Sequence, residues 1–419
     1  MTNISKFSMG IGDRFGMEGA AQLRAFLAAK DRGVTIAPVW NKSNREHSLI
    51  GTRPEDVRIE ADAAVKACQW KGPYFVDADH IGLATVDKFL NAADFFTIDV
   101  ADAIGKTTSE ASIIRYVSEM QRFAGALRIP GVAEPVAVTQ ASLQKIAAKY
   151  LFAVEEAGRV YQHIAQRKGE GTFVTEVSFD EANSPQTPAE LFFILAAAAR
   201  EGIPVATVAP KFTGEFLKGI DYVGDIRRFA QEFEEDLAVL AFAKQIFALP
   251  TALKLSIHSG SDKFSLYPIM HRALKKADAG IHLKTAGTTW LEEVIGLAAA
   301  GGDGLAFAKS LYREACGRYD DMAKPYLTVI AIDRQALPTP AQVDAFGAQE
   351  YVEALQHNQA CPRFNIHFRQ MVHISFRLAA EKQAQYLDLL KTNRASIETH
   401  VTNNLLKRHI EPLFLGTSA

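Results

Sequence analysis

The sequence predicts a (β/α)8 barrel of the TIM type, with a helical insertion after the fourth strand and a C-terminal helical extension. Two observations lead to this α/β fold class. Short β-type runs recur along the first 330 residues, and each is followed by a polar loop and a stretch with helical spacing. Most of these runs are apolar on both faces, which is typical of parallel strands that are covered by helices.

The runs that we interpret as barrel strands are Phe7 to Gly12, Val34 to Val39, Pro73 to Val76, Phe95 to Val100, Phe173 to Val177, Val205 to Ala209, Leu253 to Ile257 and Ile281 to Leu283. Helical spacing between them covers Ala20 to Ala29, Pro54 to Ala67, Pro188 to Arg200, Ile226 to Ile246 and Thr289 to Ala299. A ninth run, Tyr326 to Ile332, exceeds the count, so either it lies outside the barrel or one of the eight is misassigned. A doubly wound open sheet is the alternative, because strand alternation does not show whether a sheet closes.

Two segments exceed the ordinary connections of a barrel. Residues 102–171 include a long helical stretch, Gln140 to Arg167, whereas βα loops usually have about 2–6 residues. We interpret this segment as a helical insertion or an elongated fourth crossover. After Pro338 the spacing is helical over Gln342 to Gln356, Ala379 to Leu390 and Ser396 to His409. We therefore expect a catalytic barrel over residues 1–335 and a helical extension over 336–419 that packs on the barrel or at a homo-oligomer interface.

Charge and apolar patterning exclude some classes of partner. The chain has 46 Lys and Arg against 48 Asp and Glu, so its net charge gives no reason to expect nucleic acid or an anionic membrane. The most apolar stretch, Leu237 to Leu253, is interrupted by Lys244, Gln245 and Pro250, and a membrane span needs about 18 uninterrupted apolar residues. We expect a soluble protein with a small-molecule ligand.

The cysteines and the N-terminus indicate a cytoplasmic location. Cys68, Cys316 and Cys361 are odd in number and far apart, which predicts neither a disulfide framework nor a thiolate zinc site. The first residues lack the basic and apolar regions of a secretory signal. Both features favour a reducing compartment.

Polar residues gather where the predicted strands end, which is where barrel enzymes carry their chemistry. A single charged residue after a strand is ordinarily a solvated loop or a helix cap, but a closed barrel would bring all of these residues to one mouth. The candidates for substrate binding at these ends are Asp13, Arg14, Lys42, Glu176, Lys211, Ser259, Asp262, Lys263 and Lys284.

Three of the 11 histidines, His80, His258 and His282, lie at predicted strand ends. Three neutral imidazoles with one or two exchangeable oxygens suit a divalent zinc, nickel, cobalt or manganese ion. Each histidine alone is more often a hydrogen-bonded structural residue, but the trio favours a metal site. His271, His367 and His373 lie on helices, where surface or packing roles are expected.

Sequence motifs for other cofactors are absent or imperfect. Gly10 to Gly16 reads G-x-G-x-x-x-G and places Asp13 and Arg14 where a dinucleotide would approach bare backbone, so no nicotinamide is expected. There is no Walker A motif and no G-x-S-x-G elbow, which argues against NTP hydrolysis and serine hydrolysis.

Several segments resemble the tagaturonate epimerase family, and the similarity covers nearly the whole chain. They are Met9 to Gly16, Asp77 to His80, Lys211 to Glu215, Leu255 to Pro268 and His282 to Trp290, of which Leu255 to Pro268 is the most specific. The resemblance implies a metal-dependent barrel enzyme that interconverts D-tagaturonate and D-fructuronate. It further implies His80, His258 and His282 as metal ligands, with Asp79 and Glu215 as proton acceptor and donor.

The implied reaction inverts C4 while the ketone is at C2, so the C4 hydrogen is not α to the carbonyl and simple enolisation cannot invert this centre. Retro-aldol cleavage of the C3–C4 bond, rotation of the aldehyde and re-addition would suffice, with a metal as Lewis acid and an acid–base pair. Oxidation and re-reduction by a nicotinamide is disfavoured by the missing fingerprint, and stepwise deprotonation at C3 stays open.

The substrate carboxylate requires a cation or backbone donors. Arg14, Lys42, Lys211, Lys263 and Lys284 are candidates, and Arg14 alone could bind it in bidentate fashion. Glu176 is either a fourth metal ligand or the partner of a sugar hydroxyl. Alternative functions are another metal-dependent sugar isomerase or aldolase on the same barrel, since fold does not fix the reaction, and a non-catalytic sugar-acid-binding protein.

Overall fold

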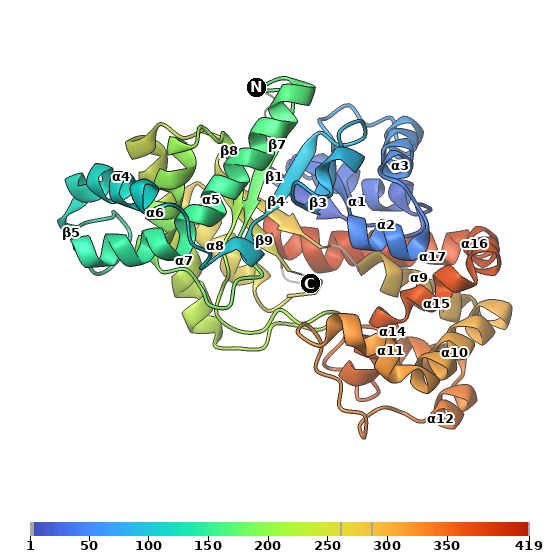
Figure 1. Cartoon of the computed structure of the whole chain (residues 1–419). Helices are drawn as coiled ribbons and strands as arrows, with labels where there is room; N and C mark the ends of the chain where they lie inside the picture. Colours follow the sequence, from blue (N-terminus) through green and yellow to red (C-terminus); the bar gives the residue numbers. More distant parts are fainter. Residues whose placement is uncertain (1–3, 260–261, 286–287, 418–419) are drawn as a thin grey trace.

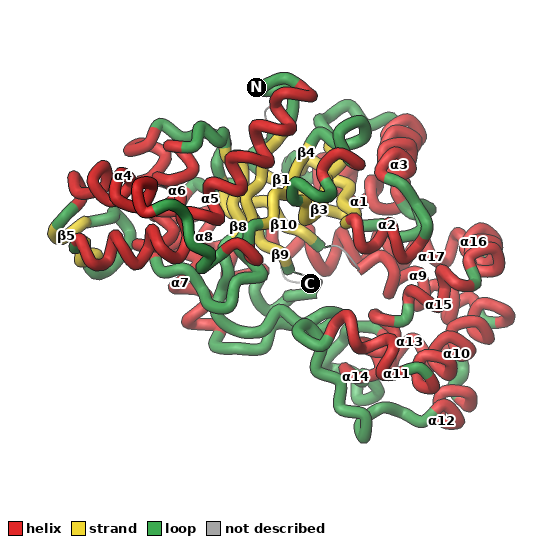
Figure 2. Tube along the Cα trace, viewed as in Figure 1, coloured by secondary structure: helices red, strands yellow, loops and turns green. Residues whose placement is uncertain are grey.

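A closed barrel of eight parallel strands forms the centre of the computed structural model, which describes residues 4–259, 262–285 and 288–417 (Figures 1 and 2). The order around the barrel is β1-β10-β9-β8-β7-β4-β3-β2. The strands are β1 (Phe7–Ile11), β2 (Ile36–Ser43), β3 (Phe75–Ile81), β4 (Phe95–Asp99), β7 (Val174–Ser178), β8 (Val205–Ala209), β9 (Lys254–His258) and β10 (Ile281–Lys284). All eight predicted runs are barrel strands, and the sheet closes, which excludes the open-sheet alternative.

Helices follow the strands and cover the barrel. They are α1 (Gly19–Asp31), α2 (Asn44–Ile50), α3 (Pro54–Ala67), α6 (Pro188–Arg200), α7 (Ile226–Phe247), α8 (Tyr267–Ala277) and α9 (Thr288–Ala300). Local sequence explains where they begin. Thr187 accepts a hydrogen bond from the Glu190 N–H in a capping box, with Pro188 as the first helical residue of α6. Asp225 caps α7 with its side chain, which accepts hydrogen bonds from the Arg227 and Arg228 N–H groups.

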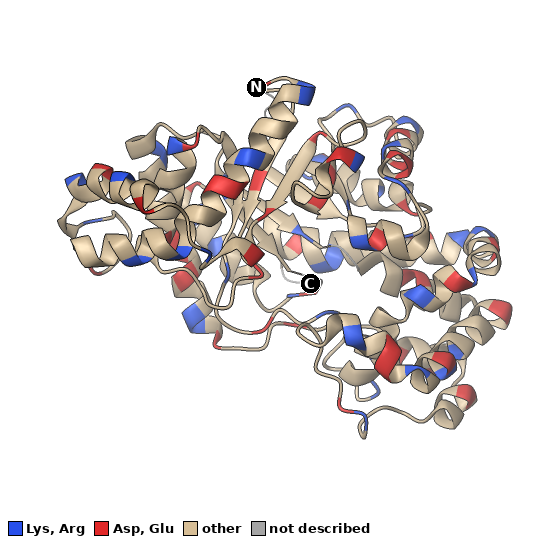
Figure 3. Cartoon of the chain, viewed as in Figure 1, with Lys and Arg blue, Asp and Glu red and all other residues tan. Residues whose placement is uncertain are grey.

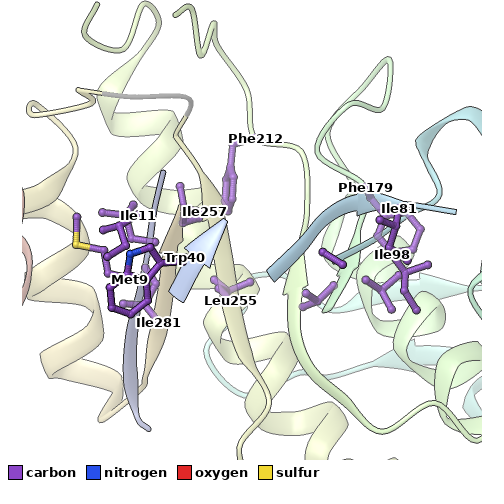
Figure 4. Close-up of a cluster of buried hydrophobic side chains, with 14 of the residues drawn as sticks. Met9, Ile11, Trp40, Ile81, Ile98, Phe179, Phe212, Leu255, Ile257 and Ile281 are labelled. Atoms are coloured by element: carbon purple, nitrogen blue, oxygen red, sulfur yellow. The ribbon is translucent and has the colours of Figure 1, made fainter. Parts of the chain in front are cut away.

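The outer faces of the strands and the inner faces of these helices form the main apolar core (Figure 4). Met9, Ile11, Trp40 and Leu255 are examples of buried outward-facing strand residues. A smaller apolar cluster fills the amino-terminal end of the barrel interior, with Phe95 among its members. Because side chains alternate along a strand, the residues between the outward-facing ones point into the barrel.

Two strands extend beyond their apolar runs. β2 continues through Asn41 and Lys42, and β3 continues through Asp77, Asp79 and His80. These polar residues were expected in loops after the strands. They extend the strands instead, because their side chains line the carboxyl-terminal mouth of the barrel while the backbone still pairs with the neighbouring strand.

The predicted insertion after β4 is present and lies at one side of the barrel (Figure 1). It contains η2 (Ala101–Ala103), α4 (Glu110–Met120), η3 (Gln121–Phe123), the antiparallel pair β5 (Gly125–Leu127) and β6 (Val136–Val138), and the long α5 (Gln140–Lys168). The short η1 (Val86–Lys88) precedes β4. The ninth run is not a strand: it follows η4 (Lys324–Tyr326) as a turn and loop outside the barrel, where the Val329 carbonyl accepts a hydrogen bond from Lys218 N–H.

The C-terminal extension is helical and lies on the side of the barrel opposite the insertion (Figure 1). After α10 (Gly302–Gly317) and α11 (Tyr319–Ala323) come α12 (Pro340–Ala345), α13 (Ala348–Leu355), α14 (Ile366–Ile374), α15 (Phe376–Glu381), α16 (Gln383–Thr392), α17 (Arg394–Asn403) and the π-helix η5 (Asn404–Leu415). The predicted helix Gln342 to Gln356 is therefore two helices. They meet at Phe346 and Gly347, both in extended conformation.

The last helices return to the barrel. Helix α17 packs on α9 and α1, and η5 packs on α1 and α8. Arg24 pairs with Glu398 at 2.7 Å, and the Ser396 hydroxyl donates to the Gly296 carbonyl at 2.8 Å. No helix within the described residues is long and apolar enough to cross a bilayer.

The α9–α17 contact depends on Gly296. A Cβ at this position would lie 2.6 Å from Ile397 Cα. We expect Gly296→Ala to lower the free energy of unfolding by about 1–3 kcal/mol, because one helix must move away from the other. Chemical denaturation measures this change. Gly317→Ala is the matched control, since a Cβ there meets nothing within 4 Å and helical alanine is favoured over glycine. Equal stability of both variants would contradict the close contact.

Candidate active site

Charged side chains from β3, β7, β9 and β10 meet at the carboxyl-terminal mouth of the barrel. Lys284 stands at the centre and is buried. Its Nζ lies 2.8 Å from Asp77 Oδ2, 2.8 Å from Asp79 Oδ1 and 3.3 Å from Glu176 Oε1. It also donates to Thr97 Oγ1 at 2.5 Å. One ammonium group therefore holds three carboxylates together.

These contacts set the protonation states of the group. Burial lowers the pKa of Lys284, but the carboxylates of Asp77 and Asp79 outweigh burial and raise it well above its usual value. Burial raises the pKa of Asp79, yet the Lys284 ammonium and His80 hold it below its usual range. Burial raises the pKa of Asp77 to about 7 against the opposing effect of Lys284. Asp79 is thus ionised at neutral pH, whereas burial makes Asp77 easier to protonate than an ordinary carboxyl group.

His80 and His258 lie side by side at the same mouth, with ring centroids 5.1 Å apart. His80 Nδ1 is 2.7 Å from Asp79 Oδ1, and its Nε2 is 3.6 Å from Asp180 Oδ1. His258 Nε2 is 2.8 Å from Glu176 Oε1, and its Nδ1 is 3.1 Å from Asp180 Oδ2. Each imidazole therefore has one nitrogen held by a buried carboxylate and the other turned toward Asp180.

This arrangement fits a metal ion. Ligand atoms of His80, Asp180 and His258 lie within 4.8 Å of one another, the one such group among the described residues. His258 Nδ1 is buried, and its contact with Asp180 Oδ2 at 3.1 Å does not have the geometry of a hydrogen bond. A carboxylate behind a ligating imidazole is the usual outer-shell arrangement of metal-binding histidine. Two imidazoles and one carboxylate suit zinc, nickel, cobalt or manganese.

The charges of the site also favour a cation. Asp77, Asp79 and Glu176 face the Lys284 ammonium, and Asp180 adds a fourth carboxylate beside His80 and His258. Burial and the lysine lower the pKa of His258, but Asp180 and Glu176 outweigh them and raise it to about 9. Without a metal ion, protonated imidazoles balance part of the negative charge of the carboxylates. A divalent metal ion would take over this role and displace the protons from the imidazoles.

His80 adopts a left-handed backbone conformation with φ of 53°, which is uncommon for a residue with a Cβ. It lies where the register between β3 and β4 shifts, between Ala78 and Ile81. Such strained residues concentrate at functional sites, where the surrounding structure holds them in place. Here the irregular strand turns the imidazole toward Asp180.

His282 does not join this group, contrary to the sequence prediction. It is two residues before Lys284 on β10 and faces the same way, so it lies about 6–7 Å deeper in the barrel. Its Nδ1 is 2.9 Å from the Ser8 hydroxyl, and its ring packs at 5.1 Å from Phe95 of the apolar floor. Burial lowers its pKa to about 3, so the imidazole is neutral. Asp180 takes the place in the cluster that His282 was expected to fill.

The candidate substrate-binding residues have several different environments. Asp13 caps its own loop, accepting from the N–H groups of Phe15, Gly16 and Glu18. Lys42 donates to the Arg14 carbonyl at 3.0 Å, and the Ser259 hydroxyl donates to the Lys284 carbonyl at 2.8 Å. These three side chains stabilise the loops of the mouth.

Two further candidates connect the β9–α8 loop to neighbouring segments. Asp262 is fully buried, where it pairs with Arg369 of α14 and lies 3.2 Å from His357 Nδ1. Lys263 Nζ donates to the carbonyls of Leu217 and Ile220. Of the motif residues nearby, Gly260, Ser261, Ala286 and Gly287 lie outside the described part of the chain.

The remaining candidates differ in how far they approach the cluster. Glu176 is within it, bonded to His258, Lys284, Thr97 and Thr207. Lys284 faces three carboxylates, which would repel a carboxylate of the substrate. Lys211 is half-buried beside Gln186, and Glu215 is exposed on the loop after β8, where it pairs with Val223 through backbone hydrogen bonds. Neither Lys211 nor Glu215 has a side-chain bond to the cluster within the described residues.

Sequence reasoning did not select Asp77 or Asp180 as site residues. Asp77 belongs to the Asp77-Ala78-Asp79-His80 segment, and strand alternation would have placed it on the same face as Asp79. Asp180 lies two residues after β7, among polar residues that follow the strand. The signal for both residues was the strand-end position, but nothing in the sequence shows which carboxylates approach a histidine from another strand.

Comparison with known proteins decides the family. A family model described as tagaturonate epimerase matches residues 1–413. The chain belongs to the tagaturonate epimerase family. It is thus an isomerase, and the resemblance found in the sequence motifs is confirmed over nearly its full length.

Individual members of the tagaturonate epimerase family agree with this assignment. A tagaturonate/fructuronate epimerase of Thermotoga maritima is 27% identical over 424 residues, covering 97% of this chain and 80% of that protein. A crystal structure of fructuronate-tagaturonate epimerase from Cohnella laeviribosi with two glycerol molecules matches with a TM-score of 0.82 and 23% identity, over 99% of this chain and 82% of that one. The native crystal structure of the same enzyme matches with a TM-score of 0.81. These structures share the fold.

Proposed function

We propose that the protein interconverts D-tagaturonate and D-fructuronate by inversion at C4, with a divalent metal bound by His80, His258 and Asp180. The arrangement of the two imidazoles supports the proposed metal site. Asp79 contacts one nitrogen of His80 and Glu176 contacts one nitrogen of His258, while the second nitrogen of each ring faces Asp180. Family membership and the named relatives support the substrate pair. When bound, the metal supplies Lewis acidity for negative charge that develops on substrate oxygens.

Retro-aldol chemistry accounts for the inversion with the residues at the mouth. A base removes the proton of the C4 hydroxyl, the C3–C4 bond breaks, and its electron pair stays on the C2–C3 fragment as an enediolate. The C4 carbon becomes an aldehyde, rotates and is attacked by C3 on its other face, and the new C4 alkoxide takes up a proton. No oxidant or reductant is required.

Asp79 is the proposed proton acceptor. Lys284 and His80 keep it ionised at neutral pH. Of the three carboxylates around Lys284, the side chain of Asp79 is 9% exposed, while those of Asp77 and Glu176 are fully buried. Glu215 is the proposed donor from the loop after β8, and its exposure allows water to restore its proton. Lys284 keeps the three carboxylates in place throughout.

The function is tested by incubating D-tagaturonate with protein that has been treated with a chelator and with protein to which metal has been restored. We expect D-fructuronate only after manganese, zinc, nickel or cobalt is added back, as measured by chromatography of the two ketouronates. Equal product formation in the chelated sample would contradict the metal requirement. A protein that forms no fructuronate with any of these metals would contradict the substrate assignment.

The same incubation in D2O tests the mechanism. In a retro-aldol reaction the hydrogens on C3 and C4 stay on their carbons, so the product should contain no carbon-bound deuterium at either position by NMR. Deuterium at C3 would instead indicate stepwise deprotonation at that carbon.

A further inference from the structure

A second charged group borders the carboxylate cluster, and it has the opposite sign. Arg14 from the loop after β1, Arg45 from α2 and Lys218 from the loop after β8 meet around two aromatic rings. The Arg45 guanidinium lies 5.6 Å from the Tyr326 ring centroid, and this ring is 6.5 Å from Phe376, on which Arg14 packs. The Lys218 N–H donates to the Val329 carbonyl, and the Val329 N–H donates to the Tyr326 carbonyl. Burial and the two arginines lower the pKa of the half-buried Lys218 amine. Glu46 is the carboxylate among them, with Oε1 3.1 Å from Arg14 Nε. This group therefore holds three cations and one carboxylate, and Glu46 is paired with Arg14.

This cationic group lies beside the proposed reaction centre. Burial raises the pKa of Glu46, but the Arg14 guanidinium outweighs burial and lowers it overall, against a smaller opposing effect of the Asp79 carboxylate. Ser43, next to the start of α2, pairs with Asp79 in the strand register. Glu181, which acts on Lys218, directly follows the proposed ligand Asp180. The cations therefore adjoin the metal end of the mouth.

Arg14 has the geometry of an anion receptor. Its side chain is 8% exposed, and the guanidinium lies 4.0 Å from the Phe376 ring centroid. Nε is used by Glu46, but Nη1 is buried with no hydrogen-bond partner within the described residues. A buried, unpaired donor on a charged group is costly, and a carboxylate satisfies it with a strong charge-assisted bond.

The C-terminal extension holds the rest of the group in place. In α14, Arg369 Nε donates to the Gly219 carbonyl at 2.6 Å, and Gln370 Nε2 donates to the Lys218 carbonyl at 3.1 Å. His373 of the same helix packs on Gly219. It is 1% exposed, and neither ring nitrogen has a hydrogen-bond partner within the described part of the chain. Burial and the cations lower its pKa, so a neutral imidazole with an unused N–H faces this region.

We propose that Arg14, Arg45 and Lys218 form the subsite that binds the carboxylate of the hexuronate, and that His373 of the C-terminal extension completes it. The proposal rests on the proposed function for the identity of the ligand. In this arrangement the two ends of the substrate bind at different places in the mouth. The carboxylate lies among the cations, and the reacting C3–C4 bond lies at the carboxylates and imidazoles. It also gives a role to the contacts of α14 with the loop after β8 and of α15 with Arg14.

Lys218→Gln tests the subsite, because its amine lies at the mouth and the substitution leaves the backbone bonds of the loop unchanged. We expect KM for D-tagaturonate to rise about 10- to 100-fold, the loss of one charge-assisted bond. The corresponding neutral ketohexose, with CH2OH in place of the carboxylate, should show less than about a threefold change in KM or, by calorimetry, in Kd. Lys218→Arg should restore most of the affinity. Lys276→Gln, on the exposed face of α8, is the control.

His373→Gln distinguishes a binding role from a packing role. We expect it to raise KM for the uronate more than KM for the neutral sugar, whereas a packing role would lower stability and affect both sugars equally. Equal effects of Lys218→Gln on both sugars, or wild-type protein that binds both sugars equally well, would overturn the subsite. Wild-type protein that binds D-tagaturonate without epimerising it would overturn the proposed function alone, provided that Lys218→Gln still weakens this binding.

Discussion

His258→Ala should remove both the bound metal and the turnover of D-tagaturonate. The substitution deletes the Nδ1 that faces Asp180 and leaves Glu176 without its imidazole partner. Loss of Lewis-acid stabilisation worth several kcal/mol corresponds to a fall in kcat on the order of 10³-fold or more. Elemental analysis of the purified variant measures the metal, and initial rates in metal-supplemented buffer measure the turnover.

Asp180→Asn and His282→Gln form a matched pair for the ligand assignment. The contacts at the mouth predict that Asp180→Asn loses metal, because its carboxylate faces both imidazoles. They predict that His282→Gln keeps metal, because His282 contacts Ser8 and Phe95 in the barrel interior. Thermal unfolding should accompany both measurements, since His282 is fully buried. Metal retained in Asp180→Asn but lost in His282→Gln would restore the three-histidine site that the sequence suggested.

The barrel could be predicted because buried parallel strands have a strong local signal. Runs such as Val205 to Ala209 are apolar on both faces, and eight of them with helices between them leave few folds to choose from. The strand ends were less accurate. Asp77 and Asp79 belong to β3 although they are polar, because the mouth of the barrel accepts charged side chains that an ordinary strand would exclude. The apolar pattern cannot reveal this.

The site could be predicted only in part, because its decisive contacts join distant strands. The strand-end position correctly brought His80 and His258 to one mouth. It placed His282 at the strand end as well, whereas β10 continues to Lys284, so His282 is one inward-facing position deeper in the barrel. The sequence also does not show which charges surround Lys284. Its sequence neighbours suggested a receptor for a substrate anion, but Asp77, Asp79 and Glu176, more than 100 residues away in the chain, surround its amine.

The role of His373 in the C-terminal extension could also not be predicted from its sequence neighbours. His373 was expected to have a surface or packing role, as a helical histidine near arginines ordinarily has. In the structure, α14 packs against the loop after β8, so that the same residue lies on Gly219, next to Lys218. The positive charges of Arg14 and Lys218 lower the pKa of His373 in addition to burial. The distribution of charge over the whole molecule is mixed (Figure 3), which agrees with the nearly balanced composition. The separation of opposite charges within the mouth is a property of tertiary packing alone.

Replacement of Lys284 should have the largest effect on stability and activity together. Lys284→Met removes the ammonium that holds Asp77, Asp79 and Glu176, and leaves their buried charges without this partner. Breaking such a buried ion pair typically costs about 3–5 kcal/mol, so we expect a large loss in the free energy of unfolding and loss of turnover even where the variant folds. Denaturant titration measures the first and the rate with D-tagaturonate the second.

Asp77→Asn tests whether the stability of the folded protein depends on the protonation of this buried carboxyl group. The pKa of Asp77 in the folded protein, about 7, exceeds its value in the unfolded chain, near 3.8, so the folded state binds more protons between these limits. Its stabilising contribution is complete below about pH 4 and is lost as the pH rises through about 7. Asp77→Asn should therefore gain stability relative to the wild type as the pH increases over this range, whereas Lys284→Met should be destabilised at neutral pH. If Asp77→Asn instead lost as much stability as Lys284→Met at pH 7, the ionised form of Asp77 would be the stabilising one, and its pKa would not be raised in the folded protein.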